Sequence, residues 1–414
     1  MNVLDATKIS NLDLLKANEL PVIVFGADVV GEVIFYALKD MGLKVEAFCD
    51  NNKNKIKYQH CGLEIVHAPT IKERYPKALI IIASTYIKDV VSQVEEMGYK
   101  TWLDCNSILK DYDFYKHESD FTRDIHFVSF SVTACMLSHN GFMDPSRLYI
   151  RSVDLIITEK CSLKCKDCSN LMQYYEKPVN IEMSEIMKSI DALANVADEI
   201  YEMRVIGGEP LVNKDYHQVV EKLNSVANVK RIVIYSNGTI TPQDSHIEIL
   251  KNPKVIFIIT SYGALSRNLD NITKKFDEHG VNYVVQKAAG WTDSGRVQKY
   301  NRTEEQLEDT FRYCCVKNYT TISDGKLYRC PFGANLARLN AAPDDASDYF
   351  SLFKEIESGK DVHQIKQDLR DFLTSKKSLK ACDFCHGRTY GMPEIEAGLQ
   401  TKTPIPYVSY KVNG

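Results

Sequence analysis

The chain has 414 residues, of which 44% are hydrophobic and 26% are charged, ordinary shares for a globular protein. Lys and Arg number 51 and Asp and Glu 55, so the net charge is 51 − 55 = −4, which argues against a nucleic-acid or membrane-surface binder. No run approaches the ~18 apolar residues of a membrane span, and residues 1–16 lack the apolar stretch of a secretory signal. We therefore expect a cytoplasmic, multidomain protein whose thiols stay reduced.

Residues 1–110 alternate short apolar strands with helices. Strands are predicted at Pro21–Phe25, Val45–Phe48, Ala78–Ala83 and Lys100–Leu103, and helices at Gly31–Met41 and around Val90–Met97. This order predicts an N-terminal Rossmann-like α/β domain with a parallel sheet. Residues 111–150 show no clear period and are interpreted as a linker with a short packed element around Phe127–Met136.

A second βα series occupies residues 151–303. Strands are predicted at Val153–Thr158, Met203–Ile206, Arg231–Tyr235, Val255–Thr260 and Asn282–Gln286, and helices at Met183–Val196, Tyr216–Val226, around His246–Lys251 and at Leu269–His279. Repeated βα units predict a parallel sheet or a partial (β/α)6 barrel. After that the period is lost, so residues 304–390 are interpreted as a small cysteine-rich domain and 391–414 as a C-terminal tail.

The twelve cysteines fall into two classes. Cys49, Cys61, Cys105 and Cys135 are scattered singly, as small buried hydrophobic residues usually are. The others are clustered: Cys161, Cys165 and Cys168 in one group, and Cys314, Cys315, Cys330, Cys382 and Cys385 in another. In a reducing compartment such clusters usually hold metal.

The first cluster has the spacing C-x3-C-x2-C and directly follows a predicted strand. A structural zinc site needs four ligands, whereas three cysteines on one loop suit a [4Fe–4S] cluster with one open iron. A zinc site completed by a remote residue is the alternative at this point.

Two further motifs follow the next two predicted strands: Ile206-Gly207-Gly208-Glu209-Pro210 and Ser236-Asn237-Gly238-Thr239. Together with the cysteine spacing, they make residues 151–290 resemble the radical S-adenosylmethionine (SAM) superfamily. One position departs from the family: Asp167 stands where an aromatic residue is usual. The resemblance implies SAM contacts from Gly207, Gly208, Glu209, Pro210, Ser236 and Asn237.

The resemblance also implies the chemistry. Members hold a [4Fe–4S] cluster that receives one electron from a small donor protein such as flavodoxin or ferredoxin. SAM, bound at the open iron, is then cleaved to methionine and a 5′-deoxyadenosyl radical, which abstracts a hydrogen from the substrate.

The second cluster combines Cys314-Cys315, a Gly325 that predicts a hairpin turn, Cys330, and the pair Cys382 and Cys385. It resembles the SPASM/twitch extensions of radical SAM enzymes, which implies a second, auxiliary [4Fe–4S] cluster at Cys314 or Cys315 with Cys330, Cys382 and Cys385. A four-cysteine zinc site is the alternative. The spare thiol, taken as Cys315, is either buried filler or a hydrogen donor to a substrate radical.

The N-terminal domain carries a degraded G-x-G-x-x-G, in which Gly26 and Gly31 are present and Asp28 replaces the second glycine. Asp50 follows Gly31 by 19 residues, the spacing of a ribose-binding acid. The adjoining Asn51-Asn52-Lys53 resembles a segment of Rossmann-like domains attached to sugar-modifying enzymes. A nucleotide or substrate site at Gly26, Gly31 and Asp50 is weighed against a purely structural role.

Three functions are therefore compared. The first is a radical SAM oxidoreductase or epimerase acting on a sugar, nucleotide sugar or glycan intermediate. The second is a peptide-modifying radical SAM maturase, although the N-terminal alternation does not match the winged-helix peptide-binding domain of such enzymes. The third is a zinc-stapled binding protein without catalysis, which would be colourless, whereas the first two would be brown.

Overall fold

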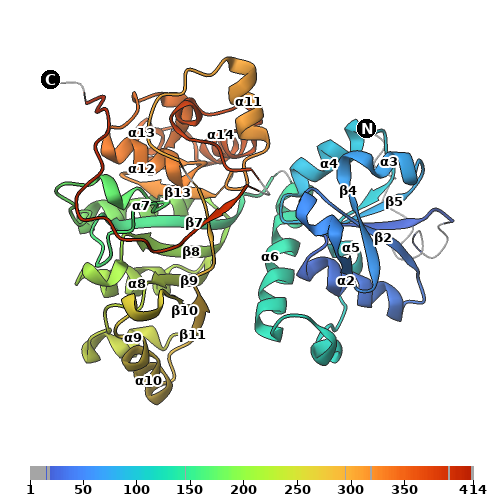
Figure 1. The fold of residues 1–414 in the computed structure, drawn as a ribbon, viewed down its shortest axis with the longest axis horizontal. Coiled ribbons are helices and arrows are strands. Elements are labelled where there is room, and N and C mark those ends of the chain that lie inside the picture. The colour runs from blue at the N-terminus through green and yellow to red at the C-terminus, as the bar shows by residue number, and fades with distance from the viewer. Residues whose placement is uncertain are drawn as a thin grey trace. The chain divides into compact units, whose positions relative to one another are not determined.

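A computed structural model describes residues 15, 19–144, 146–293, 295–317, 319–389 and 392–411. The chain divides into two compact units, Met1–Tyr149 and Ile150–Gly414 (Figure 1). Each is an α/β unit with a largely parallel sheet, which confirms the predicted fold class. Among the described helices, none combines the length and apolar character needed to cross a lipid bilayer.

The N-terminal unit is built on a six-stranded sheet in the order β3-β4-β2-β1-β5-β6. Its strands are β1 (Val22–Phe25), β2 (Val45–Asp50), β3 (Gln59–His60), β4 (Leu63–His67), β5 (Leu79–Ile82) and β6 (Trp102–Leu103). Its helices are α2 (Val29–Asp40), α3 (Ile71–Arg74), α4 (Ile87–Glu96), α5 (Asn106–Leu109) and α6 (Ile125–Met143). All neighbouring strands are parallel except the β3–β4 pair, so the parallel order is that of a doubly wound fold.

Alternation along the central strands builds two apolar cores. In β1, Val24 joins the core beneath α2, α5 and α6, whereas Ile23 joins the core beneath α3 and α4. In β5, Ile81 and Ile80 are divided in the same way. Because both faces of the sheet are covered, these strands are apolar throughout, and the sequence signal was correspondingly clear.

The region predicted as a linker, residues 111–150, instead contains a long helix, and residues up to Tyr149 belong to the N-terminal unit. Helix α6 spans 19 residues and packs Val128 and Val132 into the α2 core. Its outer face carries Phe127, which is half exposed. Because apolar residues lie on both faces of this helix, no 3.6-residue period marks it in the sequence.

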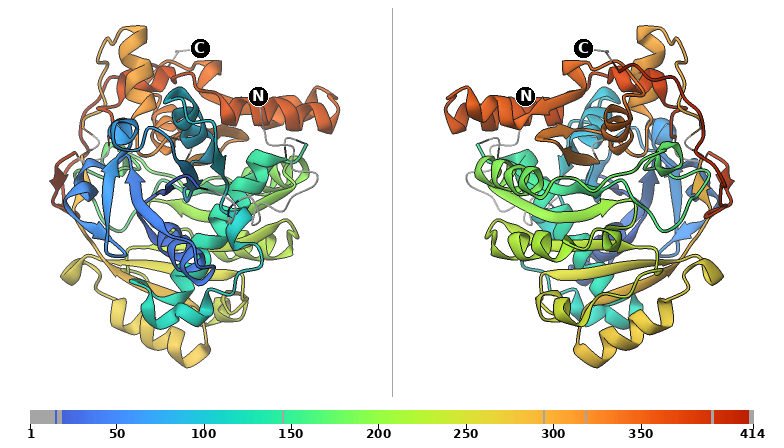
Figure 2. Two further views of the ribbon diagram at one scale, coloured as in Figure 1. Left: turned by 90° about the vertical axis from the view of Figure 1, so that its right-hand side faces the viewer. Right: turned by 90° about the vertical axis from the view of Figure 1, so that its left-hand side faces the viewer.

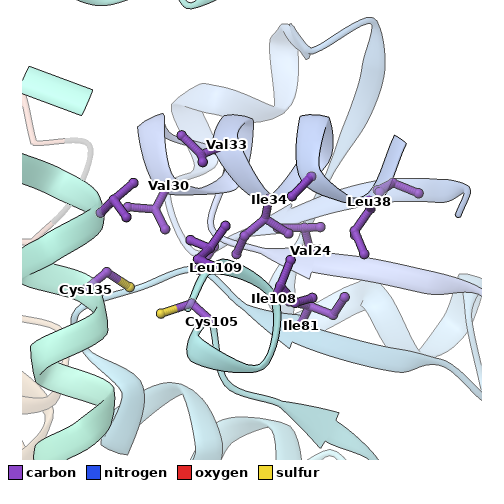
Figure 3. Close-up of a cluster of buried hydrophobic side chains, with 14 of the residues drawn as sticks. Val24, Val30, Val33, Ile34, Leu38, Ile81, Cys105, Ile108, Leu109 and Cys135 are labelled. Atoms are coloured by element: carbon purple, nitrogen blue, oxygen red, sulfur yellow. The ribbon is translucent and has the colours of Figure 1, made fainter. Parts of the chain in front are cut away.

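Cys105 and Cys135, which are far apart in sequence, meet at one end of the α2 core, beside Leu109 (Figure 3). Both are fully buried together with His139. The His139 Nδ1 accepts the Cys105 N–H at 2.9 Å, and Nε2 lies 2.9 Å from the Ser84 carbonyl oxygen. The imidazole is thus bonded within the fold at both nitrogens, and the group ties α6 to two loops of the sheet.

The second unit is built on an eight-stranded sheet in the order β11-β10-β9-β8-β7-β13-β14-β15. Its strands are β7 (Tyr149–Thr158), β8 (Glu199–Gly207), β9 (Val229–Ser236), β10 (Val255–Ser261), β11 (Tyr283–Lys287), β13 (Thr320–Ser323), β14 (Lys326–Tyr328) and β15 (Tyr349–Ser351). A separate pair joins β12 (Trp291–Thr292) to β16 (Glu394–Ile395). Five strands, β7 to β11, therefore stand in chain order, and the sixth parallel strand, β13, pairs with β7 at the other side rather than following β11.

Helices connect and flank this sheet. They are α7 (Met183–Val196), α8 (Tyr216–Ser225), α9 (Ile247–Leu250), α10 (Leu269–His279), α11 (Glu304–Arg312), α12 (Pro331–Leu339), α13 (Leu352–Glu357) and α14 (Val362–Thr374). Helix α10 lies at the β11 end and α14 at the opposite end (Figures 1 and 2). Regular helices thus continue beyond residue 304, where the sequence showed no period.

Candidate functional site

Four loops at the carboxyl ends of β7, β8, β9 and β10 converge in the second unit. The loop after β7 carries Cys161, Cys165 and Cys168, and the turn after β8 is the Gly-Gly-Glu-Pro motif. Hydrogen bonds join the two, from the Gly208 N–H to the Thr158 oxygen at 3.1 Å and from the Glu209 N–H to the Lys160 oxygen at 2.9 Å. In open α/β sheets, ligands bind at this edge.

The two glycines of this turn are required by close backbone contact. A Cβ on Gly207 would lie 2.1 Å from the Thr158 oxygen, and one on Gly208 would lie 2.2 Å from the Lys160 oxygen. Gly207 also has a φ of +148°, which favours glycine. The motif therefore lets the β8 turn lie directly against the start of the cysteine loop.

Glu209 joins the β8 turn to the end of β9. It is 1% exposed, and its carboxylate accepts the Asn237 N–H at 2.7 Å, the Leu211 N–H at 3.3 Å and the Ser236 hydroxyl at 3.3 Å. Burial raises its pKa to about 7, and these hydrogen bonds oppose the rise. The Glu209 carboxylate is therefore held in place by three donors within the protein.

Asn237 connects the β9 end to the cysteine loop. Its Nδ2 lies 3.1 Å from the Ser162 hydroxyl and 3.7 Å from the Cys161 sulfur. The backbone carbonyl of Asn237 accepts a hydrogen bond from the Ser266 hydroxyl at 2.7 Å. The side-chain amide of Asn268 donates to the backbone carbonyl of Thr239 at 2.6 Å. The sequence analysis did not single out Ser266 and Asn268, because they belong to no recognisable motif. Their position shortly after β10 was the one available signal that they lie near the other loops.

All three sulfurs of the first cluster face N–H donors. Burial raises the pKa of the Cys161 thiol, and a hydrogen bond from the Leu163 backbone N–H opposes the rise. Burial likewise raises the pKa of Cys168, and the backbone N–H groups of residues 170–172 oppose it. At Cys165 the donor is a side chain, the Gln400 Nε2 at 3.3 Å. A neutral thiol is a weak acceptor, so this donor set fits anionic sulfurs that ligate a metal cluster.

Asp167, the departure from the family pattern, is half of an ion pair. Its carboxylate accepts a hydrogen bond from the Arg296 Nη1 at 2.7 Å. The neighbouring Val297 N–H donates to the Tyr174 hydroxyl at 3.1 Å, which anchors the same segment. The cysteine loop is therefore braced by charge where an aromatic side chain is usual.

The second cysteine group gathers around the start of α12. The two-residue turn Asp324-Gly325 has positive φ at both positions and closes the β13–β14 hairpin, as predicted, which leads directly to Cys330. Burial raises the pKa of Cys330, and the neighbouring Cys314, Cys385 and Cys382 raise it further. Cys314 therefore lies with the other three.

Cys315 stands apart from that group. Burial raises its pKa, with Cys314 as the cysteine neighbour, and its N–H donates to the Arg388 carbonyl at 2.7 Å. The Arg388 guanidinium opposes the burial-driven pKa increase of both Cys168 and Cys385. Arg388 thus lies close to both cysteine groups, which its sequence position did not indicate.

In the N-terminal unit, the predicted nucleotide-site residues have partners inside the fold. Asp50 accepts the Ala27 N–H at 3.0 Å and the Lys55 ammonium at 2.9 Å. A Cβ on Gly31 would lie 2.0 Å from the Gly26 oxygen, so that glycine allows the strand and helix to pack closely. The structure brings Gly26, Gly31 and Asp50 together, in contacts that a purely structural role explains.

An open pocket of about 650 Å³ lies beyond the ends of β10 and β11. Tyr262, Lys287 and Glu396 line it together with residues 288–290. Burial raises the pKa of Tyr262, and the three cysteines of the first cluster raise it further, so its hydroxyl lies near them. The pocket therefore borders the cysteine loop.

Comparison with protein families agrees with this geometry. Residues 155–322 match the Radical SAM superfamily, and residues 18–102 match the family described as C2185-like, N-terminal. The superfamily match runs from within β7 to within β13 and includes all the loops that converge on the first cysteine cluster.

Curated relatives include GTP 3′,8-cyclases. That of Mannheimia succiniciproducens is 30% identical over 139 residues, which are 32% of this chain and 40% of the cyclase. That of Clostridium acetobutylicum is 31% identical over 97 residues, 22% of this chain and 30% of the cyclase. The chain thus spans less than half the length of these relatives. Among solved structures, BtrN in complex with AdoMet and 2-DOIA is 14% identical, with a TM-score of 0.36, covering 62% of this chain and 97% of BtrN.

Proposed function

We propose that this protein is a radical SAM enzyme that holds a [4Fe–4S] cluster at Cys161, Cys165 and Cys168. When bound, the cluster and SAM supply a 5′-deoxyadenosyl radical that removes a hydrogen atom from the substrate. One observation carries the proposal: the match to the superfamily coincides with a loop whose three sulfurs all face N–H donors.

The chain's own residues would bind and orient SAM at the strand ends. Gly207 and Gly208 keep the β8 turn free of side chains beside the cysteine loop. Glu209, which Pro210 follows, bonds to Ser236 and Asn237, so its carboxylate joins the two proposed SAM-contacting segments. We assign Glu209 a positioning role in addition to the SAM contact that the resemblance implies.

We place one auxiliary [4Fe–4S] cluster at Cys314, Cys330, Cys382 and Cys385. Support comes from their mutual proximity and from donors such as the Gly387 N–H, 3.4 Å from the Cys385 sulfur. A four-thiolate cluster leaves no open iron, so its role would be to accept an electron or to brace the pocket. Cys315, outside the group and beside Arg388, is then the candidate hydrogen donor of an epimerase; without such a donor the outcome is an oxidation.

For the substrate we propose a sugar, nucleotide sugar or glycan intermediate. Tyr262, Lys287 and Glu396 are among the residues that line the pocket, and they support a substrate with polar groups within an otherwise largely apolar wall. The related cyclases have GTP in their name, and a nucleotide-linked substrate falls in the proposed class. A cytoplasmic location and an electron donor such as flavodoxin or ferredoxin complete the proposal.

The test is anaerobic purification and reconstitution with iron and sulfide, followed by SAM and dithionite. We expect a brown protein with about eight irons, for two four-iron clusters, that forms 5′-deoxyadenosine. A colourless protein that carries zinc and leaves SAM intact would instead identify a zinc-stapled binding protein. Screening nucleotide sugars against peptides for enhanced 5′-deoxyadenosine formation then separates the two enzyme classes.

A further inference from the structure

The C-terminal segment crosses the first cysteine loop. The Lys166 N–H donates to the Leu399 oxygen at 2.6 Å and the Thr401 N–H to the Lys164 oxygen at 2.7 Å, an antiparallel bridge that pairs Cys165 with Gln400. Just before it, Glu396 lines the pocket. The segment thus runs from the pocket wall to the cluster ligands, across 235 residues of sequence separation.

The orientation of the Gln400 amide is fixed by its neighbours. Its Oε1 accepts the Lys164 N–H at 2.7 Å, so the NH2 group is on the other side. From there Nε2 reaches the Gly398 oxygen at 2.7 Å and the Cys165 sulfur at 3.3 Å. A flipped amide would place its oxygen against both acceptors, so a donor must face the sulfur.

Gly398 makes this path possible. Its φ is +78°, and a Cβ there would lie 2.8 Å from the Tyr262 ring. The turn therefore packs against the pocket tyrosine and delivers the next two residues to the cysteine loop. Leu399 supplies the backbone bond and Gln400 the side-chain bond.

We propose that Gln400 is a positioning residue that raises the reduction potential of the first cluster through its hydrogen bond to Cys165. An N–H donor at a ligand sulfur stabilises the extra negative charge of the reduced cluster, and hydrogen bonds to sulfur are a recognised determinant of cluster potential. The inference rests on the proposed function, because it requires the [4Fe–4S] cluster at this loop.

The test is a reductive titration of the reconstituted full-length protein, followed by electron paramagnetic resonance. Gln400→Leu removes the donor, whereas Gln400→Glu keeps the acceptor for Lys164 and replaces the donor with a carboxylate. Thr401→Val is the matched control, because the Thr401 hydroxyl bonds to the Thr403 oxygen at 2.9 Å and not to sulfur. Signals of any second cluster serve as an internal reference.

We expect full iron in all variants and a lower first-cluster potential in Gln400→Leu. A tenfold change in the reduction equilibrium corresponds to about 59 mV for one electron. Gln400→Glu should shift further, while Thr401→Val and the reference signal stay unmoved. If Gln400→Leu loses iron, the reduction potential of the first cluster in Gln400→Glu still tests the proposal.

Unmoved potentials with full iron, or iron loss in Gln400→Glu, would overturn the inference, because Gln400 would then only pack or clamp the loop. Failure of the proposed function is a separate result: the wild-type protein itself would hold no reducible cluster and would not cleave SAM.

Discussion

Two groups of cysteines in this chain contrast in spacing and in surroundings. In the N-terminal unit, ligand atoms of Cys105, Cys135 and His139 lie within 4.8 Å of one another, in a fully buried site among apolar side chains. In the second unit, the first cysteine cluster sits in a loop after β7, surrounded by N–H donors. The two groups therefore differ in the chemistry around their ligand atoms and not only in how closely those atoms lie.

The physical reason is what each environment favours. The compact group is satisfied within the fold, since both ring nitrogens of His139 have backbone partners. In the cysteine loop, in contrast, N–H donors face the sulfurs, and these hydrogen bonds are strongest when the sulfurs are negatively charged. A ligated thiolate meets that condition, whereas a core thiol does not.

The largest expected effect comes from removing sulfurs in the two groups. Cys161→Ala, Cys165→Ala and Cys168→Ala should each lose about four irons and abolish 5′-deoxyadenosine formation, because each removes one of three protein ligands. Cys135→Ala is the counterpart in the N-terminal unit and should keep full iron and full SAM cleavage. Iron and sulfide analysis decides; iron loss in Cys135→Ala would put a metal in the compact group and erase the contrast.

The second expected effect separates two adjacent cysteines. Cys314→Ala should lose about four irons and form no product while retaining uncoupled SAM cleavage, because the first cluster stays intact. Cys315→Ala should keep all its iron, since its thiol lies outside the group around Cys330. If Cys315→Ala cleaves SAM without forming an epimerised product, Cys315 is the hydrogen donor; if it is fully active, oxidation is the better interpretation. Iron loss in both variants would contradict the four-ligand assignment.

The sequence predicted the parts of this arrangement that are local. Helices α7 and α10 begin and end as predicted, because their apolar faces repeat with the helical period. The cysteine loop and the two turns after β8 and β9 could be found because each is a short motif at a strand end. Their mutual contacts follow from the parallel sheet, whose strand ends share one edge.

What the sequence could not supply were partners from distant segments. Gln400 reaches Cys165 across 235 residues, and Arg296 reaches Asp167 across 129. No periodicity or spacing records such pairs. In the N-terminal unit the sequence likewise did not reveal the partners of Asp50. This residue has the spacing of a ribose-binding acid, and in the structure its carboxylate accepts hydrogen bonds from Lys55 and from the Ala27 N–H.

A third prediction tests the close contact between the β8 turn and the cysteine loop. Gly208→Ala should weaken SAM binding more than tenfold, because its Cβ would lie 2.2 Å from the Lys160 oxygen and 2.9 Å from the Cys161 Cβ. Gly333→Ala is the control near the other cysteine group, since its Cβ would meet Ala381 at an ordinary 3.5 Å. Equilibrium dialysis of SAM against the reconstituted proteins measures the difference, and equal affinities would show that the turn can shift at no cost.

The last expected effect concerns Glu209 and pH. Burial raises its pKa to about 7 from the ordinary 4.5, so the folded protein binds this proton more tightly than the unfolded chain does. The resulting stabilisation is complete at low pH and is lost as pH rises from about 4.5 to about 7. Integrated over that window at 1.36 kcal/mol per unit, the loss is about 3 kcal/mol.

Glu209→Gln stays neutral at every pH and tests this directly. Its fixed cost, a poorer acceptor for the Asn237 N–H, does not change with pH. The free energy of unfolding of Glu209→Gln, measured by anaerobic denaturant titration between pH 5 and 8, should therefore rise relative to wild type by about 2.5 kcal/mol. Because both proteins carry the same cysteines, cluster contributions cancel in the difference. Parallel profiles would mean that Glu209 titrates alike in folded and unfolded protein, and that the hydrogen bonds from Asn237, Leu211 and Ser236 fully offset its burial.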